Sequence, residues 1–413
     1  MRPAARRWLI VGALFAVTYC VSTPLAAYGV FLPVLAETFA WSRGSIAGAL
    51  SINLLLGGLA GFAIGALADR HGPRVMLACT VPLAGAAFAL VSTIGARWQL
   101  YLLVGLVGGI GMSSFYLLSA STIARWFPER RGLALALVLV GFNLGYISAG
   151  PLAARLIARL GWRCAYAALG GACGVAALLA ALLVRLPTAS EAAGLRPRSS
   201  GASLTIGSRG PGLTLGEALV DPRQWYLNAA WLLAGGLTLM VSVHIVPFAR
   251  DRGLGLADAS LALSAYGIGS VTGRLLAGAV SDRLGPIPTM RAAYAIQACA
   301  LLALWWVPAR EALLGCLVAF GVGFAASDTM LVHVVPDVFG VRSMGAVMGV
   351  LSLGWRSGAA LGPAAAGFLH DATGSYAIPF GTAPLGIVLS WFFFALATSG
   401  RRRLPGSAPA RSP

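Results

Sequence analysis

The sequence predicts an all-α membrane protein with twelve transmembrane helices arranged as two pseudo-symmetric six-helix bundles. Three observations lead to this fold class: the composition, the spacing of the apolar runs and an internal repeat. Of the 413 residues, 58% are hydrophobic and only 10% are charged, whereas a soluble domain has about 25% charged residues. These charges are too few to cover a soluble protein of this length, so lipid must be the solvent for most of its surface.

The apolar runs have the length that a bilayer requires, since a spanning helix needs about 20 mostly apolar residues. Twelve runs meet this requirement, at 9–35, 45–68, 75–95, 99–124, 132–157, 165–184, 225–249, 259–280, 288–307, 311–335, 344–369 and 377–397. The stretch between the sixth and seventh runs is rich in Ser, Gly, Pro and Arg, which is typical of a flexible linker. The predicted division is an N-terminal bundle (1–184), a cytoplasmic linker (185–224), a C-terminal bundle (225–400) and a disordered cytoplasmic tail (401–413).

An internal repeat relates the two halves. The loop after the second span reads GALADRHGP (65–73) and the loop after the eighth reads GAVSDRLGP (278–286), an offset of 213 residues. A second pair, Gly150–Pro151 and Gly362–Pro363, repeats at an offset of 212. Two echoes at nearly one offset indicate a duplicated six-helix unit, and parallel repeats of this kind are found in membrane transporters.

The repeated loops each carry an acid–arginine pair, Asp69–Arg70 and Asp282–Arg283. Such an Asp can bond to a helix N-terminus or to an Arg of the other half and so hold the cytoplasmic side closed. A single copy is explained equally well by a tight turn with solvated charges. Two copies at a matched offset favour a conformational gate formed by Asp69, Arg70, Asp282 and Arg283.

The formal net charge of +17 is explained by topology. If the N-terminus is cytoplasmic, 20 of the 30 arginines fall in predicted cytoplasmic segments, 8 fall on the opposite side and 2 fall inside spans. This bias follows the positive-inside rule. It predicts a multi-pass protein of a bacterial-type inner (plasma) membrane with both termini cytoplasmic, surrounded by the lipid bilayer and without a nucleic-acid partner.

The stretch GALADRHGPRVML (65–77) resembles the signature loop of the major facilitator superfamily. Residues 28–51, 125–137 and 361–376 resemble the first two helices, the loop into helix 5, and helix 11 with its exit in the monocarboxylate transporter and oxalate/formate antiporter families. The resemblance covers essentially the whole chain. It implies the fold of that superfamily and secondary active transport by alternating access.

The sequence also departs from these families. Animal monocarboxylate transporters carry an Asp one turn before the Arg of helix 8, whereas this chain has Ser270, and their acidic opening of helix 1 is absent here. Their scheme of proton coupling therefore does not transfer intact. The basic residues in helices 8 and 11 of the oxalate/formate antiporter match Arg274 and Arg356, which leaves mono- and dicarboxylates open as substrates.

Three charges are predicted inside the membrane. Arg274 lies eight residues before Asp282, and Arg356 lies 14 residues after Arg342, so they are roughly 12 Å and 21 Å from those ends along their helices. A charge near the bilayer centre costs about 2.5–3.5 kcal/mol or more and is usually functional. The planar fork of Arg binds a carboxylate through two parallel charge-assisted bonds. The alternatives are snorkelling to the interface or a static pair with a buried acid.

Asp328 is the third intramembrane charge and is the candidate for proton coupling. It can pair with Arg274 or Arg356 in the empty protein and take up a proton when the substrate displaces it. Further candidates to line the substrate cavity are polar or aromatic residues at mid-membrane depth: Tyr28, Tyr116, Asn143, Tyr146 and Tyr266. For any one of them, packing is the commoner role. His244 and His333 titrate near neutral pH, but a lone His is more often structural, and neither is a candidate.

These residues favour a proton-coupled transporter of small organic anions such as lactate or pyruvate, acting as a monomer, with Arg274 binding the carboxylate. The alternatives are an oxalate-type dicarboxylate antiporter that uses Arg274 and Arg356, or an efflux transporter of other organic compounds. The sequence has no P-loop, no HExxH motif and no clustered Cys or His ligands. We therefore expect no enzyme activity, no cofactor and no metal site.

Overall fold

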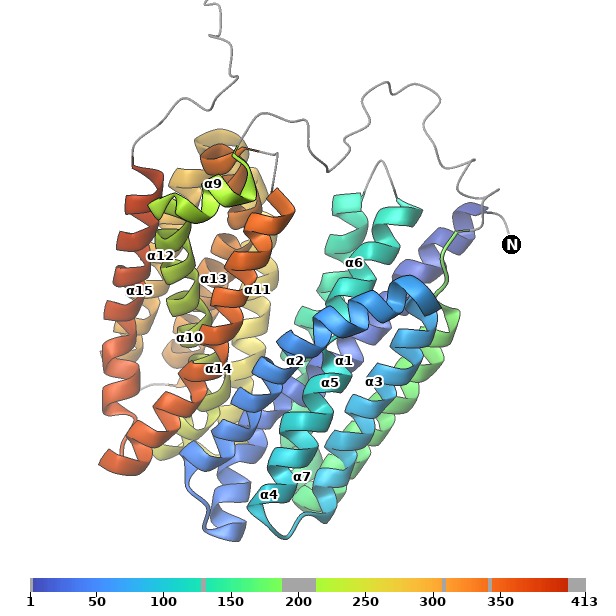
Figure 1. Cartoon of the computed structure of the whole chain (residues 1–413). Helices are drawn as coiled ribbons and strands as arrows, with labels where there is room; N and C mark the ends of the chain where they lie inside the picture. Colours follow the sequence, from blue (N-terminus) through green and yellow to red (C-terminus); the bar gives the residue numbers. More distant parts are fainter. Residues whose placement is uncertain (1–2, 128–130, 188–212, 307–309, 341–343, 400–413) are drawn as a thin grey trace, which may run out of the picture. The chain divides into compact units, whose positions relative to one another are not determined.

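The computed structural model describes residues 3–127, 131–187, 213–306, 310–340 and 344–399. The described residues are almost wholly helical (Figure 1). The helices are α1 (Pro3–Phe39), α2 (Arg43–His71), α3 (Pro73–Leu90), η1 (Val91–Thr93), α4 (Arg97–Leu100), η2 (Tyr101–Gly108), α5 (Gly109–Met112), α6 (Phe115–Trp126), α7 (Arg131–Leu183), α9 (Leu215–Val220), α10 (Pro222–Asp251), α11 (Leu256–Leu284), α12 (Pro286–Trp306), α13 (Arg310–Phe339), α14 (Met344–Thr373) and α15 (Ala377–Thr398).

The helices account for the twelve predicted spans. In the described part of the chain, nine helical stretches are long and apolar enough to cross a membrane. One of them, Leu133–Leu183, contains two predicted spans, because α7 runs through a break at Gly161 (φ 75°). The two long helices outside this set are α11 and α14, which carry Arg274 and Arg356. Together these helices form the all-α membrane architecture that the sequence predicts.

The predicted span 99–124 is not one regular helix. It consists of α4, the π-helix η2, α5 and α6, with a break at Ser113 and Ser114. Asn53 on α2 donates from Nδ2 to the Val104 carbonyl of η2 at 2.7 Å. A Cβ on Gly109 would lie 2.8 Å from the Asn53 carbonyl. Close packing on α2 and a side-chain bond to the helix backbone therefore accompany the irregular geometry.

One short helix forms inside the predicted linker. Thr214 accepts a hydrogen bond from the Glu217 N–H at 3.3 Å, and the Glu217 carboxylate accepts one from the Thr214 N–H at 2.7 Å. This is a capping box, which satisfies two N–H groups at the start of a helix, and α9 follows it. Linker residues 188–212 and the tail after residue 399 lie outside the described residues.

The internal repeat is visible in the local structure. Both ends of α2 recur in α11 at an offset of 213 residues, as do the starts of α3 and α12 and of α7 and α14. The positive-φ residues recur at the same offset: Ala40 with Gly253, Gly72 with Gly285 and Gly161 with Gly374. Because a positive φ marks a tight change of chain direction, three matched turns extend the duplication that two sequence echoes indicated.

Glycine is required at the turn of the repeated loop. Gly72 and Gly285 both have φ 84°. Their N–H groups donate to the carbonyls of Ala68 and Ser281, each at 2.8 Å. A proline follows at the first position of α3 and of α12, where its missing N–H has no helical partner to lose. The Gly-Pro of each copy thus ends one helix and starts the next.

The chain divides into two compact units. Unit 1 comprises Met1–Ser200, Leu239–Ile268 and Pro363–Ile378, and unit 2 comprises Gly201–Thr238, Gly269–Gly362 and Pro379–Pro413. Unit 1 thus adds the end of α10, the start of α11 and the end of α14 to the first half of the chain. The predicted boundaries at 184 and 225 follow chain order instead, and they stay a prediction.

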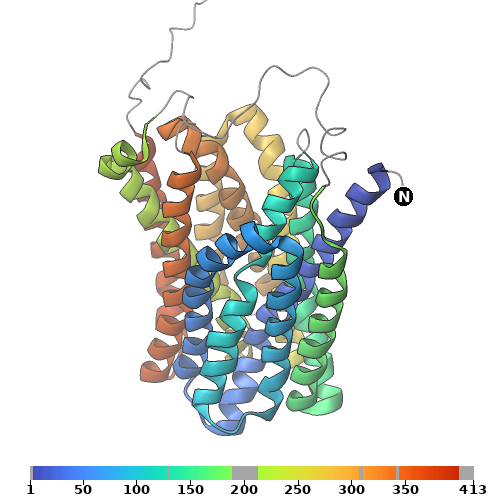
Figure 2. The ribbon, with the colours of Figure 1, turned by 45° about the vertical axis from the view of Figure 1, so that its right-hand side comes forward.

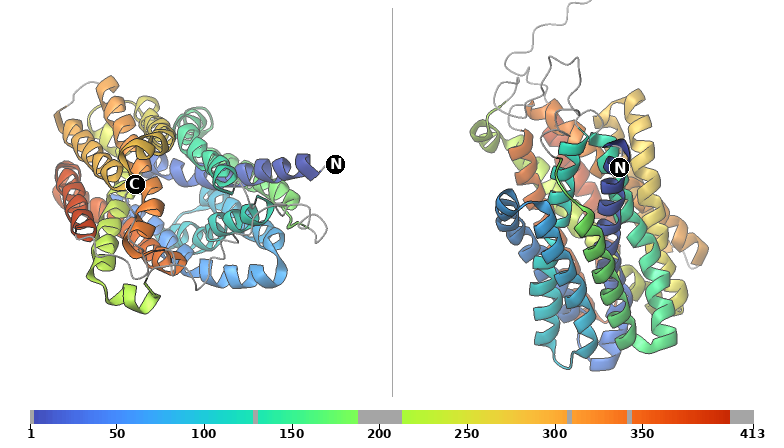
Figure 3. Two further views of the ribbon diagram at one scale, coloured as in Figure 1. Left: turned by 90° about the horizontal axis from the view of Figure 1, so that it is seen from above. Right: turned by 90° about the vertical axis from the view of Figure 1, so that its right-hand side faces the viewer.

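Within unit 1, α7 packs along α1 and α3, and the helices from α1 to α7, blue to green in the figures, lie side by side (Figures 2 and 3). Glycines permit the closest contact: a Cβ on Gly170 would meet the backbone of Ala89, and one on Gly85 would meet that of Gly174. In unit 2, α12 and α13 form an extensive pair. Small residues let helix backbones approach closely in lipid.

Candidate substrate-binding site

Arg274 on α11 forms an ion pair with Asp328 on α13 inside unit 2. The distance from Arg274 Nη2 to Asp328 Oδ2 is 2.8 Å, and the two side chains are 30% and 33% exposed. Arg274 Nε is buried and has no hydrogen-bond partner among the described residues. The guanidinium is therefore half-buried, is engaged by one carboxylate and keeps a donor unused.

Glycines on α11 bring this pair together. A Cβ on Gly269 or Gly273 would overlap the carbonyl oxygens of Val318 and Val322 on α13. The two glycines are four residues apart and lie on one face of α11, so they allow its backbone to touch α13. Arg274 follows Gly273 directly. The close approach thus places its guanidinium within reach of Asp328 on the facing helix.

Arg356 lies on α14 in unit 2, is partly buried and makes no hydrogen bond or ion pair with any described residue. Its helix packs on α10 through Gly354 and Gly358, whose added Cβ atoms would overlap Asn228 Oδ1 and the Leu232 carbonyl. At 100° per residue, Arg356 is about 200° around the helix from Gly354. It therefore points away from the face that packs on α10.

The aromatic candidates lie in unit 1 and differ in their surroundings. Tyr146 and Tyr266 are nearly buried and pack edge to face, with ring centroids 5.9 Å apart. Asn143, three residues before Tyr146, is also buried, whereas Tyr116 is 50% exposed. Tyr28 is fully buried, and its hydroxyl donates to the Ile46 carbonyl of α2 at 2.6 Å. Tyr28 thus serves as a packing contact between α1 and α2 here, and its place in a substrate cavity stays a prediction.

The predicted gate residues lie at the ends of α2 and α11. Arg70, Asp282 and Arg283 are exposed, and none of the three has an ion-pair partner within the described ranges. The side chain of Asp69 lies outside the described residues. The gate therefore stays a prediction, supported by the matched geometry of Gly72 and Gly285.

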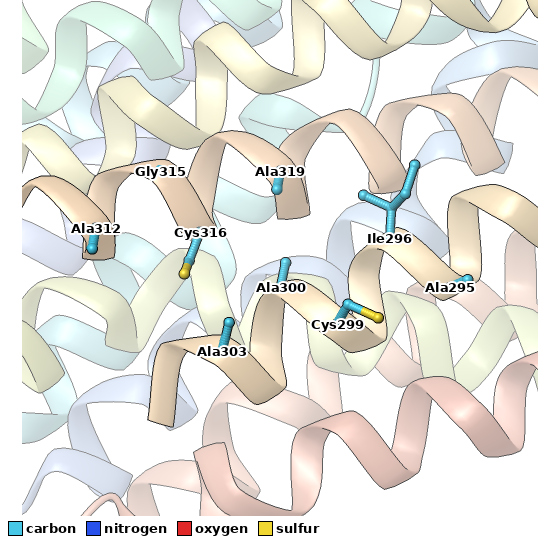
Figure 4. A pocket seen from close by; sticks show the side chains of 9 residues that line it. All are labelled: Ala295, Ile296, Cys299, Ala300, Ala303, Ala312, Gly315, Cys316 and Ala319. Atoms are coloured by element: carbon cyan, nitrogen blue, oxygen red, sulfur yellow. The ribbon is translucent and has the colours of Figure 1, made fainter. Parts of the chain in front are cut away.

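A groove of about 570 Å³ lies between α12 and α13 (Figure 4). It is lined by Ala295, Ile296, Cys299, Ala300, Ala303, Ala312, Gly315, Cys316 and Ala319. None of these side chains is charged, and the two thiols are only weak donors. The groove therefore offers a carboxylate no suitable partner, unlike the surroundings of Arg274.

The sequence did not predict a second group of charges, which lies within unit 1. Arg43 at the start of α2 meets Asp251 of α10, and His370 and Asp371 of α14 lie beside them. His244, which the sequence did not favour as a site, is fully buried on α10 and its two ring nitrogens contact the Tyr376 hydroxyl and the Pro363 carbonyl, each at 2.8 Å. Most of these residues lie in or near the stretches 28–51 and 361–376 that resemble the monocarboxylate transporter family. This resemblance was the feature of the sequence that could have pointed to them.

Known proteins are similar to nearly the whole chain. The family model described as Major Facilitator Superfamily matches residues 14–312 and 238–413. Human "Monocarboxylate transporter 11" is 29% identical, over 97% of this chain and 84% of the relative. Rat "Monocarboxylate transporter 3" is 28% identical, over 95% of this chain and 79% of the relative.

Solved structures show the same fold. A bacterial homolog of the human lysosomal transporter Spinster has a TM-score of 0.76 at 16% identity and covers 95% of this chain and 97% of its own. The nucleoside transporter NupG has a TM-score of 0.74 at 13% identity and covers 95% of this chain and 100% of its own. At these identities the likeness concerns the fold alone.

Proposed function

Because this chain belongs to the Major Facilitator Superfamily and is a membrane transporter rather than an enzyme, we propose that it moves small carboxylates of the lactate or pyruvate type with proton coupling. The observation that carries this proposal is the ion pair of Arg274 with Asp328. The relatives named as monocarboxylate transporters support it.

The pair suits exchange of one carboxylate for another. Asp328 binds Arg274 in the way that a substrate carboxylate would, through an oxygen 2.8 Å from the guanidinium. When a substrate takes this position, Asp328 loses its cation and remains partly buried. A partly buried carboxylate without a cation favours its protonated form. Substrate binding and proton uptake are then linked at neighbouring atoms, and Arg274 keeps one negative partner throughout.

The transport cycle is completed when the protein alternates between two conformations, each open to one side of the membrane. The repeated loops with Asp69, Arg70, Asp282 and Arg283 close the cytoplasmic side in one state and separate in the other. Tyr116, Asn143, Tyr146 and Tyr266 contribute polar and aromatic surface to the substrate cavity. The chain works as a monomer in a bacterial-type inner membrane, with both termini cytoplasmic.

Arg356 supports a second candidate function, exchange of dicarboxylates such as oxalate. This partly buried guanidinium has no described anionic partner, so a second carboxylate of the substrate would satisfy it. A dianion neutralises both arginines at once and needs no proton. Internal substrate then replaces the proton gradient as the driving force.

Uptake into proteoliposomes tests the proposal. We expect purified protein to accumulate labelled lactate or pyruvate under an inward proton gradient, and Arg274→Ala to abolish uptake. Arg274→Lys should retain only part of it, because an ammonium is a point charge without the planar fork. Arg291→Ala on α12 is the matched control. Full carboxylate uptake by Arg274→Ala would overturn the proposal.

Counterflow separates the two candidates. Vesicles loaded with unlabelled oxalate and lacking a pH gradient should take up labelled oxalate if the protein is a dicarboxylate antiporter. Loss of this exchange in Arg356→Ala, with lactate uptake absent in the unmodified protein, would favour the antiporter. Lactate uptake that requires a proton gradient and persists in Arg356→Ala would favour the monocarboxylate symporter.

A further inference from the structure

Four residues form a charged group that we call the outer cluster, after the side of the membrane predicted for it: Arg43, Asp251, His370 and Asp371. All four lie in unit 1. Arg43 binds Asp251 through both ends of its guanidinium, with Nη1 2.7 Å from Oδ2 and Nη2 2.8 Å from Oδ1. A bidentate pair of this kind is the strongest geometry between the two groups.

Asp371 binds the start of α2 directly. Its carboxylate oxygens accept hydrogen bonds from the backbone N–H groups of Arg43 at 2.9 Å and Gly44 at 2.7 Å. The first N–H groups of a helix have no intrahelical partner and carry partial positive charge. A Cβ on Gly367 would lie 2.6 Å from Gly44 Cα, so the two backbones touch just beside this cap. The end of α14 is thus docked on the start of α2.

The outer cluster joins the two halves of the internal repeat. Arg43 and Gly44 belong to the first six helices of the chain, whereas Asp251, His370 and Asp371 belong to the second six. In alternating access the repeats rock against each other around the substrate site. Opening at this end must therefore move the start of α2, with Arg43, away from Asp251 and Asp371. His370 stays beside these two acids, because it belongs to the same half of the repeat.

His370 follows the predicted span 344–369 and faces both acids. Its Nε2 lies 3.5 Å from Asp251 Oδ2, and its Nδ1 lies 3.8 Å from Asp371 Oδ1. Nδ1 is buried and has no hydrogen-bond partner in the described part of the chain. These distances exceed those of ordinary hydrogen bonds. The ring is therefore close to two carboxylates that Arg43 and the α2 N-terminus already occupy.

The charged or titratable side chains near His370 come from three helices. Arg43 belongs to α2, Asp251 and the more distant His244 belong to α10, and Asp371 belongs to α14, as does His370 itself. Tyr376, in the turn after α14, packs against it with the rings tilted by 39° and their centroids 4.4 Å apart. Burial raises the pKa of the Tyr376 phenol, which therefore stays neutral. Burial, and then the charge of Arg43, lower the pKa of His370 despite the two acids. The closed cluster therefore favours the neutral form of His370.

Opening reverses each of these effects. Water reaches the ring, the Arg43 guanidinium leaves Asp251, and Asp371 loses the N–H groups at the start of α2. All three changes raise the proton affinity of His370. From this geometry we propose that His370 takes up a proton from the outer side as the cluster opens, and then serves as the cation beside Asp251 and Asp371 in place of Arg43 and the start of α2.

The sign of the linkage follows from the two states. The folded, closed form has the lower pKa and the open form the higher one, so protonation favours opening. The effect is fully present below the pKa of the closed form and is lost as pH rises above the pKa of the open form. If the two values differ by one unit, acidification raises the open-to-closed ratio up to about tenfold. The inference rests on alternating access within the proposed function but not on a carboxylate substrate.

Distances between two spin labels test this proposal without substrate. Labels at Thr38→Cys and Ala372→Cys, both exposed near the cluster, report its opening in a full-length chain whose six native cysteines are replaced. We expect a larger long-distance population at pH 5.5 than at pH 8. His370→Gln should remove the pH dependence, and His370→Arg should keep the long distance at both pH values.

Controls make the result specific. His333→Gln, an exposed His on α13, should keep the full pH response, and a melting curve confirms that each variant folds. A pH response that survives in both His370→Gln and His370→Arg would overturn the proposal, as would opening at high rather than low pH. Failure of carboxylate uptake would refute the proposed substrate and leave this measurement unaffected.

Discussion

Neutralising Asp328 should free Arg274 for an incoming anion. In the structure this carboxylate holds the guanidinium at 2.8 Å, so a substrate must compete with it. The variant Asp328→Asn keeps the size of the side chain and removes the charge. We therefore expect tighter carboxylate binding together with the loss of proton-driven accumulation.

The magnitude follows from the exposure of the pair. Exposed ion pairs contribute about 0.2–1 kcal/mol, whereas loss of a partner from a buried pair costs about 3–5 kcal/mol. Both side chains are about one-third exposed, so this pair lies between the two cases. We take the free energy that a substrate must overcome to displace Asp328 as about 1.4 kcal/mol. The binding-competent fraction is then about one in ten, and freeing Arg274 should lower the apparent Kd about tenfold.

Thermal stabilisation of the purified protein by lactate measures this change, because binding to the folded state raises Tm by mass action. The titration midpoint should move about tenfold lower in Asp328→Asn. Asp337→Asn, an exposed acid near the end of the same helix, should leave the midpoint in place. An unchanged or higher midpoint in Asp328→Asn, with the protein folded, would show that the two carboxylates do not share Arg274.

Three further changes test the fold around these sites. Gly285→Ala places a Cβ on a residue with φ 84° and should lower the free energy of unfolding by about 1–3 kcal/mol. The control Gly349→Ala meets open space and should leave stability unchanged. Equal Tm values for the two variants would refute the role of the turn. Gly273→Val should force α11 away from α13 and lower the free energy of unfolding by about 1–3 kcal/mol. Uptake should also fall, because Arg274 and Asp328 separate. Normal Tm and uptake would contradict this. Tyr28→Phe removes the bond to the Ile46 carbonyl and should lower Tm through about 0.5–1.5 kcal/mol without altering the KM for uptake; a changed KM would instead place Tyr28 in the cavity.

Much of the architecture was predictable because its causes are local. Apolar runs of spanning length mark the helices, and Gly-Pro at residues 72–73 and 285–286 marks matched turns by backbone chemistry alone. The capping box at Thr214 and Glu217 was equally local, but it lies in a polar stretch that suggested a linker. The break in the span 99–124 was not predictable, because it depends on contacts with Asn53 and other residues of α2.

The sequence by itself determined the all-α, duplicated membrane fold and predicted two arginines and an aspartate inside its spans, since charge, length and repetition can be read along the chain. Only the tertiary structure decided that Asp328 pairs with Arg274 rather than Arg356, and that Arg43 meets Asp251 and Asp371, 208 and 328 residues away. Such partners depend on how each helix is rotated and how closely glycines let two helices approach. Neither quantity is set by the residues of one helix alone.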